Sequence, residues 1–87
     1  MYNIYIGSNN KTKRLELGKI KSITGLYFDG FTLIPCTGYY KGNQESSVIV
    51  QIQTTKRTLI NSLINNLKIQ LKQESIGLQQ TNQLIFK

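Results

Sequence analysis

The sequence predicts a single α+β domain over residues 1–87, with two helices on one face of an antiparallel sheet. Three observations support this fold class. Stretches with alternating apolar residues occur near both ends and in the middle of the chain. Two stretches with apolar residues at every third or fourth position separate them, and turn-forming residues lie between the stretches. The length suits one domain with a marginal core, so self-association would help to stabilise it.

The first half of the chain predicts a strand, a helix and an edge strand. Residues 2–6 alternate polar and apolar side chains and stop at the turn formers of residues 7–10. Residues 14–27 place apolar side chains at three- and four-residue spacing, which is typical of an amphipathic helix. Residues 31–40 are rich in aromatic, branched and Thr side chains, but Pro35 cannot donate a ladder hydrogen bond. We therefore expect this strand to lie at a sheet edge or to contain a bulge.

The second half predicts a hairpin, a second helix and a last strand. Residues 41–44 form a hairpin-length loop before a strand over residues 46–54, which should pair antiparallel with the preceding strand. A helix capped by Thr54 or Thr55 should follow, because the next apolar residues form one continuous stripe. These residues are Leu59, Ile60, Leu63, Ile64, Leu67 and Leu71. Residues 75–79 predict the last strand, which residues 84–86 would extend or flank.

The predicted order is therefore βαββαβ, which corresponds to the ferredoxin-like architecture. Both crossovers are long enough to hold a helix, as right-handed parallel connections require. The helices would cover one face of the sheet. The other face would be open to water, a ligand or a second copy of the chain, and Ile34 and Ile49 on that face favour burial.

Short motifs spread over most of the chain agree with this fold. They are Ile4-Tyr5-Ile6-Gly7, Phe28-Asp29-Gly30-Phe31-Thr32, Gly38-Tyr39-Tyr40-Lys41-Gly42, Glu45-Ser46-Ser47-Val48 and Gln73-Glu74-Ser75-Ile76. In this order they resemble the pattern of a family of small bacterial and phage βαββαβ proteins of unknown function. The resemblance implies the fold and carries no established activity.

The composition argues against most catalytic and metal chemistry. The chain has no His, one Cys and four acidic residues against eleven Lys and Arg, with a net charge of +7. Without His and with distant carboxylates at Glu45 and Glu74, neither a zinc site nor an oriented nucleophile is expected. We therefore predict a binding protein that is not an enzyme and uses no cofactor or metal. The lone Cys36 and the lack of a signal-like or spanning apolar segment predict a cytoplasmic protein without a membrane partner.

The first candidate binding region is a basic stretch near the N-terminus. Turn amides at Asn9 and Asn10 precede the predicted first helix, whose N-terminal end is positively polarised. Five cations accompany them, namely Lys11, Lys13, Arg14, Lys19 and Lys21. Phosphate binding is one interpretation of this pattern, and a solvated basic surface that keeps the protein soluble is the other.

The second candidate region is the motif Gly38-Tyr39-Tyr40-Lys41-Gly42. Adjacent strand residues point to opposite faces, so at most one of Tyr39 and Tyr40 joins the core. The other ring could stack on a base, with Lys41 close enough for a phosphate. Alternatively, one ring packs inside and the other packs across a dimer seam. The predicted ligand-binding residues are thus Asn9, Asn10, Lys11, Lys13, Arg14, Tyr39, Tyr40 and Lys41.

Residues 3–9 also resemble the first-strand motif of RNA recognition domains, in which an aromatic residue on the open sheet face stacks a base. Residues 45–52 lack the aromatic residues that such domains carry on the third strand. We therefore favour an ordinary buried strand with Tyr5 half covered over the RNA interpretation.

These observations together predict non-catalytic binding of a small phosphorylated or nucleotide-like ligand by a symmetric homo-dimer or higher oligomer. Small, basic, metal-free proteins of this kind resemble phage accessory proteins, and one task of such proteins is to sequester a nucleotide immune signal in the host cytoplasm without cleaving it. RNA or single-stranded DNA binding through the basic residues is an alternative prediction. A protein-interaction module that inhibits an acidic host protein is another.

Overall fold

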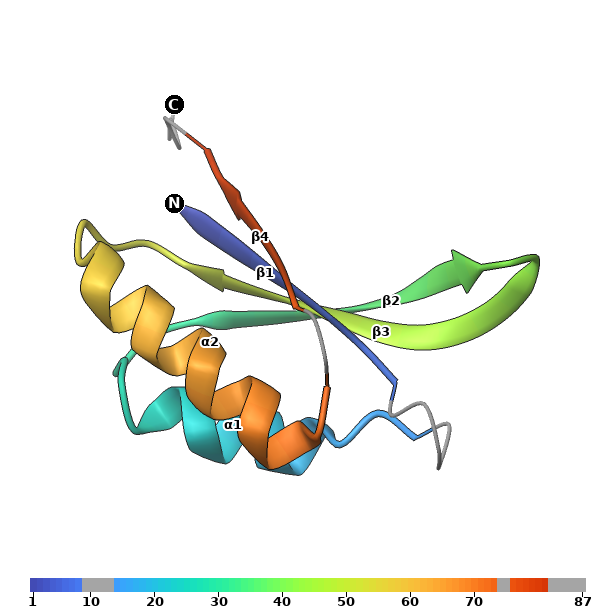
Figure 1. The fold of residues 1–87 in the computed structure, drawn as a ribbon. Helices are drawn as coiled ribbons and strands as arrows, with labels where there is room; N and C mark the ends of the chain where they lie inside the picture. Colours follow the sequence, from blue (N-terminus) through green and yellow to red (C-terminus); the bar gives the residue numbers. More distant parts are fainter. Residues whose placement is uncertain (9–13, 74–75, 82–87) are drawn as a thin grey trace.

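A computed structural model describes residues 1–8, 14–73 and 76–81, except for the side chain of Tyr40. Within these residues, two helices pack against a four-stranded sheet (Figure 1). The elements are β1 (Tyr2–Gly7), α1 (Leu17–Gly25), β2 (Thr32–Tyr40), β3 (Asn43–Ile52), α2 (Arg57–Leu71) and β4 (Gly77–Gln80). The predicted α+β class and the predicted order of strands and helices are confirmed.

The strands lie side by side in the order β2-β3-β1-β4, and each neighbouring pair is antiparallel. This arrangement fits the predicted ferredoxin-like architecture. β2 is an edge strand, as Pro35 predicted. Its pairing with β3 is continuous from Thr32 opposite Gln51 to Tyr40 opposite Asn43, so the edge position accommodates the proline without a bulge.

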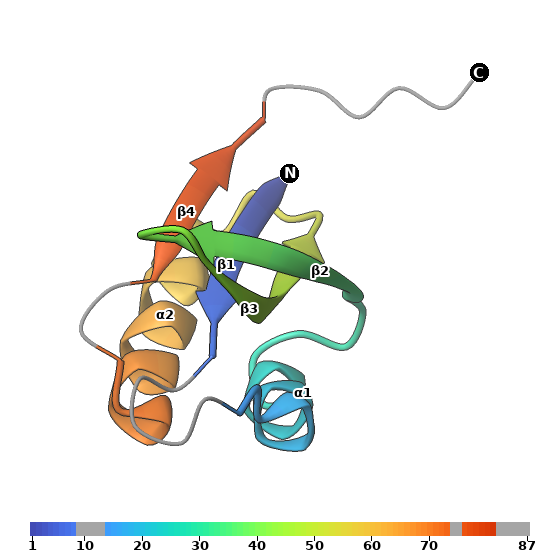
Figure 2. The ribbon, with the colours of Figure 1, turned by 90° about the vertical axis from the view of Figure 1, so that its right-hand side faces the viewer.

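Both helices cover the same face of the sheet (Figure 2). Alternate residues of β1 and β3 point towards the helices, and the apolar stripe of α2 packs on them. The buried apolar residues form one cluster: Tyr2, Ile4, Ile6, Ile20, Ile23, Val48, Val50, Ile52, Ile60, Leu63, Leu67 and Leu71. The intervening strand residues point to the opposite face. The sheet therefore has a helix side, which carries the core, and an open side.

The connection between β2 and β3 is a two-residue turn, shorter than the predicted loop over residues 41–44. Lys41 and Gly42 both have positive φ, at 51° and 78°, as a type I′ hairpin turn requires. The left-handed conformation at Gly42 carries no steric penalty because glycine has no Cβ. Pairing therefore resumes at Asn43, three residues before the predicted start of the strand. The hairpin extends well beyond the helices (Figure 1).

The ends of the helices differ from the predicted ends. α1 begins at Leu17 and not at residue 14, because the Leu17 amide donates to the Leu15 carbonyl in a tight turn before the helix. α2 begins after Lys56, so the predicted caps Thr54 and Thr55 are wrong. Thr54 instead accepts a hydrogen bond from the Lys56 amide at 3.1 Å. No helix in the described part of the chain is long and apolar enough to cross a membrane.

The last strand is also shifted relative to its prediction. β4 spans Gly77–Gln80, whereas residues 75–79 were expected. It pairs with the first four residues of β1, and the Thr81 amide continues the ladder to the Met1 carbonyl at 2.8 Å. The predicted extension over residues 84–86 lies outside the described residues.

The C-terminal end of α2 leads to a stability prediction. Lys72 adopts the left-handed conformation, with its amide bonded to the Ile69 carbonyl and the Gln73 amide bonded to the Lys68 carbonyl. Because this conformation costs a residue with a Cβ about 1–2 kcal/mol, Lys72→Gly should raise the free energy of unfolding. The greater freedom of glycine in the unfolded chain offsets part of the gain, which leaves about 0.5–1 kcal/mol measurable by urea unfolding.

The matched control is Lys21→Gly, the same change in the interior of α1. That variant should lose about 0.5–1 kcal/mol, since glycine is unfavourable inside a helix. Equal losses in both variants would contradict the role assigned to Lys72.

Candidate ligand-binding site

The end of β1 is held from two sides. The Ser8 hydroxyl donates a hydrogen bond to the Ser46 carbonyl of β3. The Gln73 side-chain amide, which follows α2, donates to the Gly7 carbonyl at 2.6 Å. The predicted ligand-binding residues Asn9, Asn10, Lys11 and Lys13 lie outside the described residues. The described chain resumes at Arg14, which is exposed.

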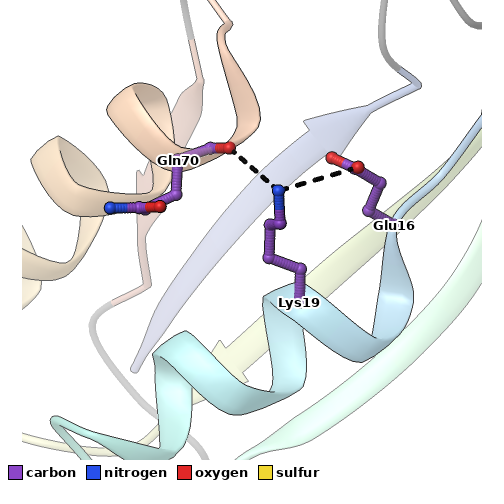
Figure 3. Close-up of polar contacts among 3 residues, drawn as sticks. All are labelled: Glu16, Lys19 and Gln70. Carbon is purple, nitrogen blue, oxygen red and sulfur yellow. Dashed lines mark hydrogen bonds and ion pairs between the residues drawn. The ribbon is translucent and has the colours of Figure 1, made fainter.

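Lys19 joins the two helices, as Figure 3 shows. Its ammonium lies 3.8 Å from a carboxylate oxygen of Glu16 and donates to the Gln70 carbonyl at 3.3 Å. That carbonyl belongs to the last turn of α2, where carbonyls lack an amide partner within the helix and a cation is favoured. Lys19 therefore supplies a hydrogen-bond donor to one carbonyl at the C-terminal end of α2. Within the basic stretch, Lys19 thus helps to hold α1 against α2.

The distal end of the β2–β3 hairpin carries an exposed aromatic ring. Tyr39 keeps 74% of its accessible surface, and Lys41 in the adjoining turn is also exposed. The alternative in which Tyr39 packs inside the domain is therefore wrong. The backbone of Tyr40 pairs with Asn43, while the side chain of Tyr40 lies outside the description.

The strand register places Tyr39 on the helix side of the sheet. Leu33 of β2 packs against the core, and the continuous register gives Tyr39 the same orientation as Leu33. Thr37, between them, pairs with Ser46, whose carbonyl accepts the hydrogen bond from Ser8. Thr37 and Tyr39 thus lie on the helix side of the sheet, beside the strand residue that binds Ser8. Tyr39, Lys41 and Arg14 are exposed members of the two predicted regions, and we refer to them as the hairpin–loop site.

The open side of the sheet has a different character, and we call its strand positions the open face. Before the final pair next to the turn, it comprises four rows across the strands: Thr32, Gln51, Asn3 and Gln79; Ile34, Ile49, Tyr5 and Gly77; Cys36, Ser47 and Gly7; and Gly38 with Glu45. Glu45 is the charged residue of these rows, and none of the positions named is Lys or Arg. A nucleic acid lying on the open face would therefore find no cation among these residues for its phosphates.

Tyr5 lies in the middle of the open face, on one of the two central strands. Its side chain remains 42% exposed, and its hydroxyl donates to the Gln79 side-chain oxygen at 2.7 Å. This agrees with the prediction of a half-covered ring. The RNA-recognition interpretation of residues 3–9 requires phosphate contacts that the rows of the open face do not provide.

Asn3, on the open face, has an unusual side chain that was not among the predicted binding residues. It is only 9% exposed, and its side-chain oxygen has no hydrogen-bond partner among the described residues. The sequence signal was available, because Asn3 stands between the core residues Tyr2 and Ile4 and must point to the open face. Its burial depends on neighbouring strands, which the sequence alone does not place.

The described residues contain no group of three or more Cys, Asp or Glu arranged to hold a metal ion. Within the described part of the chain, Glu45 of β3 is not part of a metal site; its side chain lies between Gly7 of β1 and Gly38 of β2. A Cβ at Gly7 would be 3.0 Å from its carboxylate oxygen, and a Cβ at Gly38 would be 3.5 Å from its Cγ. The carboxylate thus rests against backbone where neighbouring side chains are absent.

Comparison with known proteins provides no relative from which a function could be transferred. No protein-family model and no curated protein matches the sequence. The resemblance to the βαββαβ family of unknown function stays a prediction. Function must therefore be inferred from the positions, contacts and charges of the described residues.

Proposed function

We propose that this protein binds a small phosphorylated, nucleotide-like ligand at the hairpin–loop site, as a symmetric oligomer and without catalysing a reaction on it. The observation that carries the proposal is the Tyr39 ring, 74% exposed and two residues from Lys41. A large exposed ring beside a cation offers the two contacts that a nucleotide requires, a flat surface for the base and a positive charge for the phosphate.

The backbone around Tyr39 favours such binding. Tyr39 belongs to a ladder that continues to the turn, and both turn residues hold left-handed conformations that fix the direction of the chain at Lys41. The backbone that carries the ring and the cation therefore needs little further ordering when a ligand binds, which favours affinity. Arg14, three residues before α1, is a second exposed cation.

The absence of His from the sequence supports binding without catalysis, because general acid–base and metal-dependent mechanisms most often employ that residue. A protein that holds a nucleotide unchanged would lower its free concentration. Sequestration of a nucleotide signal is therefore the biological role that we propose for the binding.

A second candidate function is binding of single-stranded nucleic acid through the helix side. The observation in its favour is the distribution of positive charge. The described Lys and Arg residues lie on the helices and connections: Arg14, Lys19, Lys21, Lys41, Lys56, Arg57, Lys68 and Lys72. Binding through many phosphates should weaken steeply as salt rises, whereas binding of one nucleotide should respond much less.

Native mass spectrometry of gently purified protein tests both candidates. The protein would be measured alone and after addition of cyclic nucleotides, ADP-ribose-type nucleotides and a short oligonucleotide. The proposed function predicts a retained, chemically unchanged nucleotide on an oligomer. Complexes with the oligonucleotide alone would favour the second candidate. A bare protein under all conditions would contradict both and favour a protein partner.

A further inference from the structure

We infer that the open face is the surface through which two copies of this chain associate. The proposed function includes a symmetric oligomer, and this inference rests on that part of the proposal and names the surface that forms the oligomer. It begins with the separation of charge in the molecule. The chain has a net charge of +7, yet the rows of the open face hold Glu45 and neither Lys nor Arg. Two such chains repel each other least when they meet on the side whose described strand positions hold no Lys or Arg.

The centre of the open face is apolar. Ile34 and Ile49 lie opposite each other on β2 and β3, and Tyr5 is the next residue of the same row, opposite Ile49 on β1. Ile34 and Ile49 are half-buried and do not belong to the core cluster or to the apolar residues packed against it. The helices therefore do not bury the remaining exposed surface of these two side chains. Covering them with a second sheet would remove their remaining apolar surface from water.

Tyr5 is already ordered for such a contact. A Cβ at Gly77 would lie 3.3 Å from Cβ of Tyr5 and 3.7 Å from its ring, so the ring rests against β4 where no side chain competes. The hydrogen bond from its hydroxyl to Gln79 fixes the other end of the side chain. Aromatic anchors with little freedom left are the residues that contribute most to interfaces.

Uncharged polar residues surround this apolar row. Thr32, Gln51, Asn3 and Gln79 form the neighbouring row, and Ser47 and Cys36 lie on the other side. An apolar centre with a polar rim is the usual arrangement of an interface between proteins.

A second copy fits this face better than other partners. A nucleic acid would need cations there, and an acidic protein would be attracted to the helix side. A twofold contact needs a self-complementary surface, and amides are suited to it because each carries both a donor and an acceptor. Glu45 lies in the last row, away from the row of Ile49, so a twofold axis near Ile49 leaves the two carboxylates at the periphery.

Sedimentation velocity of the full chain without ligand tests the inference. The wild type should form a dimer in the micromolar to millimolar range. Ile49→Lys should weaken the dimer at least about tenfold, because it places like charges across the twofold axis. Ile69→Lys is the matched control, since Ile69 is 72% exposed on α2 and should leave the dimer unchanged. Thr32→Lys, at an exposed position of the same face, decides the outcome if Ile49→Lys does not fold.

A monomeric wild type would overturn the inference, as would a dimer that withstands Ile49→Lys and Thr32→Lys or that Ile69→Lys disrupts equally. Nucleotide binding would be measured separately by calorimetry on the same proteins. Loss of the dimer with unchanged nucleotide binding separates this inference from the proposed ligand site. A dimer that binds no nucleotide would leave the interface standing and remove the proposed function.

Discussion

Tyr39→Ala is expected to weaken nucleotide binding by about 1–3 kcal/mol, or about 5- to 150-fold in the dissociation constant. The physical reason is the loss of a stacking surface that the domain itself leaves 74% exposed. Because the ring is exposed in the free protein, its removal should leave the core intact and the thermal unfolding midpoint nearly unchanged. Isothermal titration calorimetry with the nucleotide retained in native mass spectrometry is the measurement.

Two further variants separate stacking from other causes. Tyr39→Phe keeps the ring without the hydroxyl and should bind nearly as well as the wild type. Tyr5→Ala removes a ring from the open face and should leave the affinity per chain unchanged. Equal affinity in wild type and Tyr39→Ala would remove Tyr39 from the site. A loss confined to Tyr5→Ala would place the ligand on the opposite side of the sheet.

Leu63→Ala should lower the free energy of unfolding by about 2–5 kcal/mol, the usual cost of truncating a buried leucine. Leu63 is fully buried in the cluster where α2 packs on β1 and β3, so its removal leaves a cavity that the surrounding strands cannot easily fill. In a domain of this size, stabilised by only a few kcal/mol, such a loss would leave much of the protein unfolded. Urea unfolding followed by circular dichroism measures the change.

Ile69→Ala is the control on the same helix. Ile69 is 72% exposed, so its truncation should change the unfolding free energy by no more than about 0.5 kcal/mol. If the two truncations had equal effects, the face of α2 that packs on the sheet would be wrongly assigned.

Much of the fold could be predicted because burial follows the periodicity of the apolar residues. Tyr2, Ile4 and Ile6 alternate in the sequence, and all three are buried against the helices. The stripe of α2 was predicted for the same reason, and Leu63 and Leu67 are fully buried. These patterns are local properties of the chain and need no knowledge of the neighbouring elements.

The ends of the elements were less predictable because they depend on hydrogen bonds that leave little trace in the composition. Residues 43–45 are polar and do not alternate with apolar residues, so the start of β3 was missed. Its actual start follows from the left-handed conformations at Lys41 and Gly42, which allow the strands to pair immediately after the turn.

The candidate site was predicted only in part. Two adjacent tyrosines implied that one of them leaves the core, but the side occupied by Tyr39 depends on the register of β2 against β3. The burial of the Asn3 amide and the lack of Lys and Arg at the described positions of the open face likewise depend on which strands are neighbours. Tertiary pairing, rather than local pattern, decides these features.

The alternation of side chains along β2 has a consequence for the stoichiometry of binding. Tyr39 points to the helix side, whereas Ile34 of the same strand points to the open face. A dimer joined through the open face would therefore carry its two ligand sites back to back, on its outer surfaces, with no residue shared between them. Each chain would bind one ligand independently of the other, with a Hill coefficient near unity. Dilution to monomers would leave the affinity for the ligand unchanged.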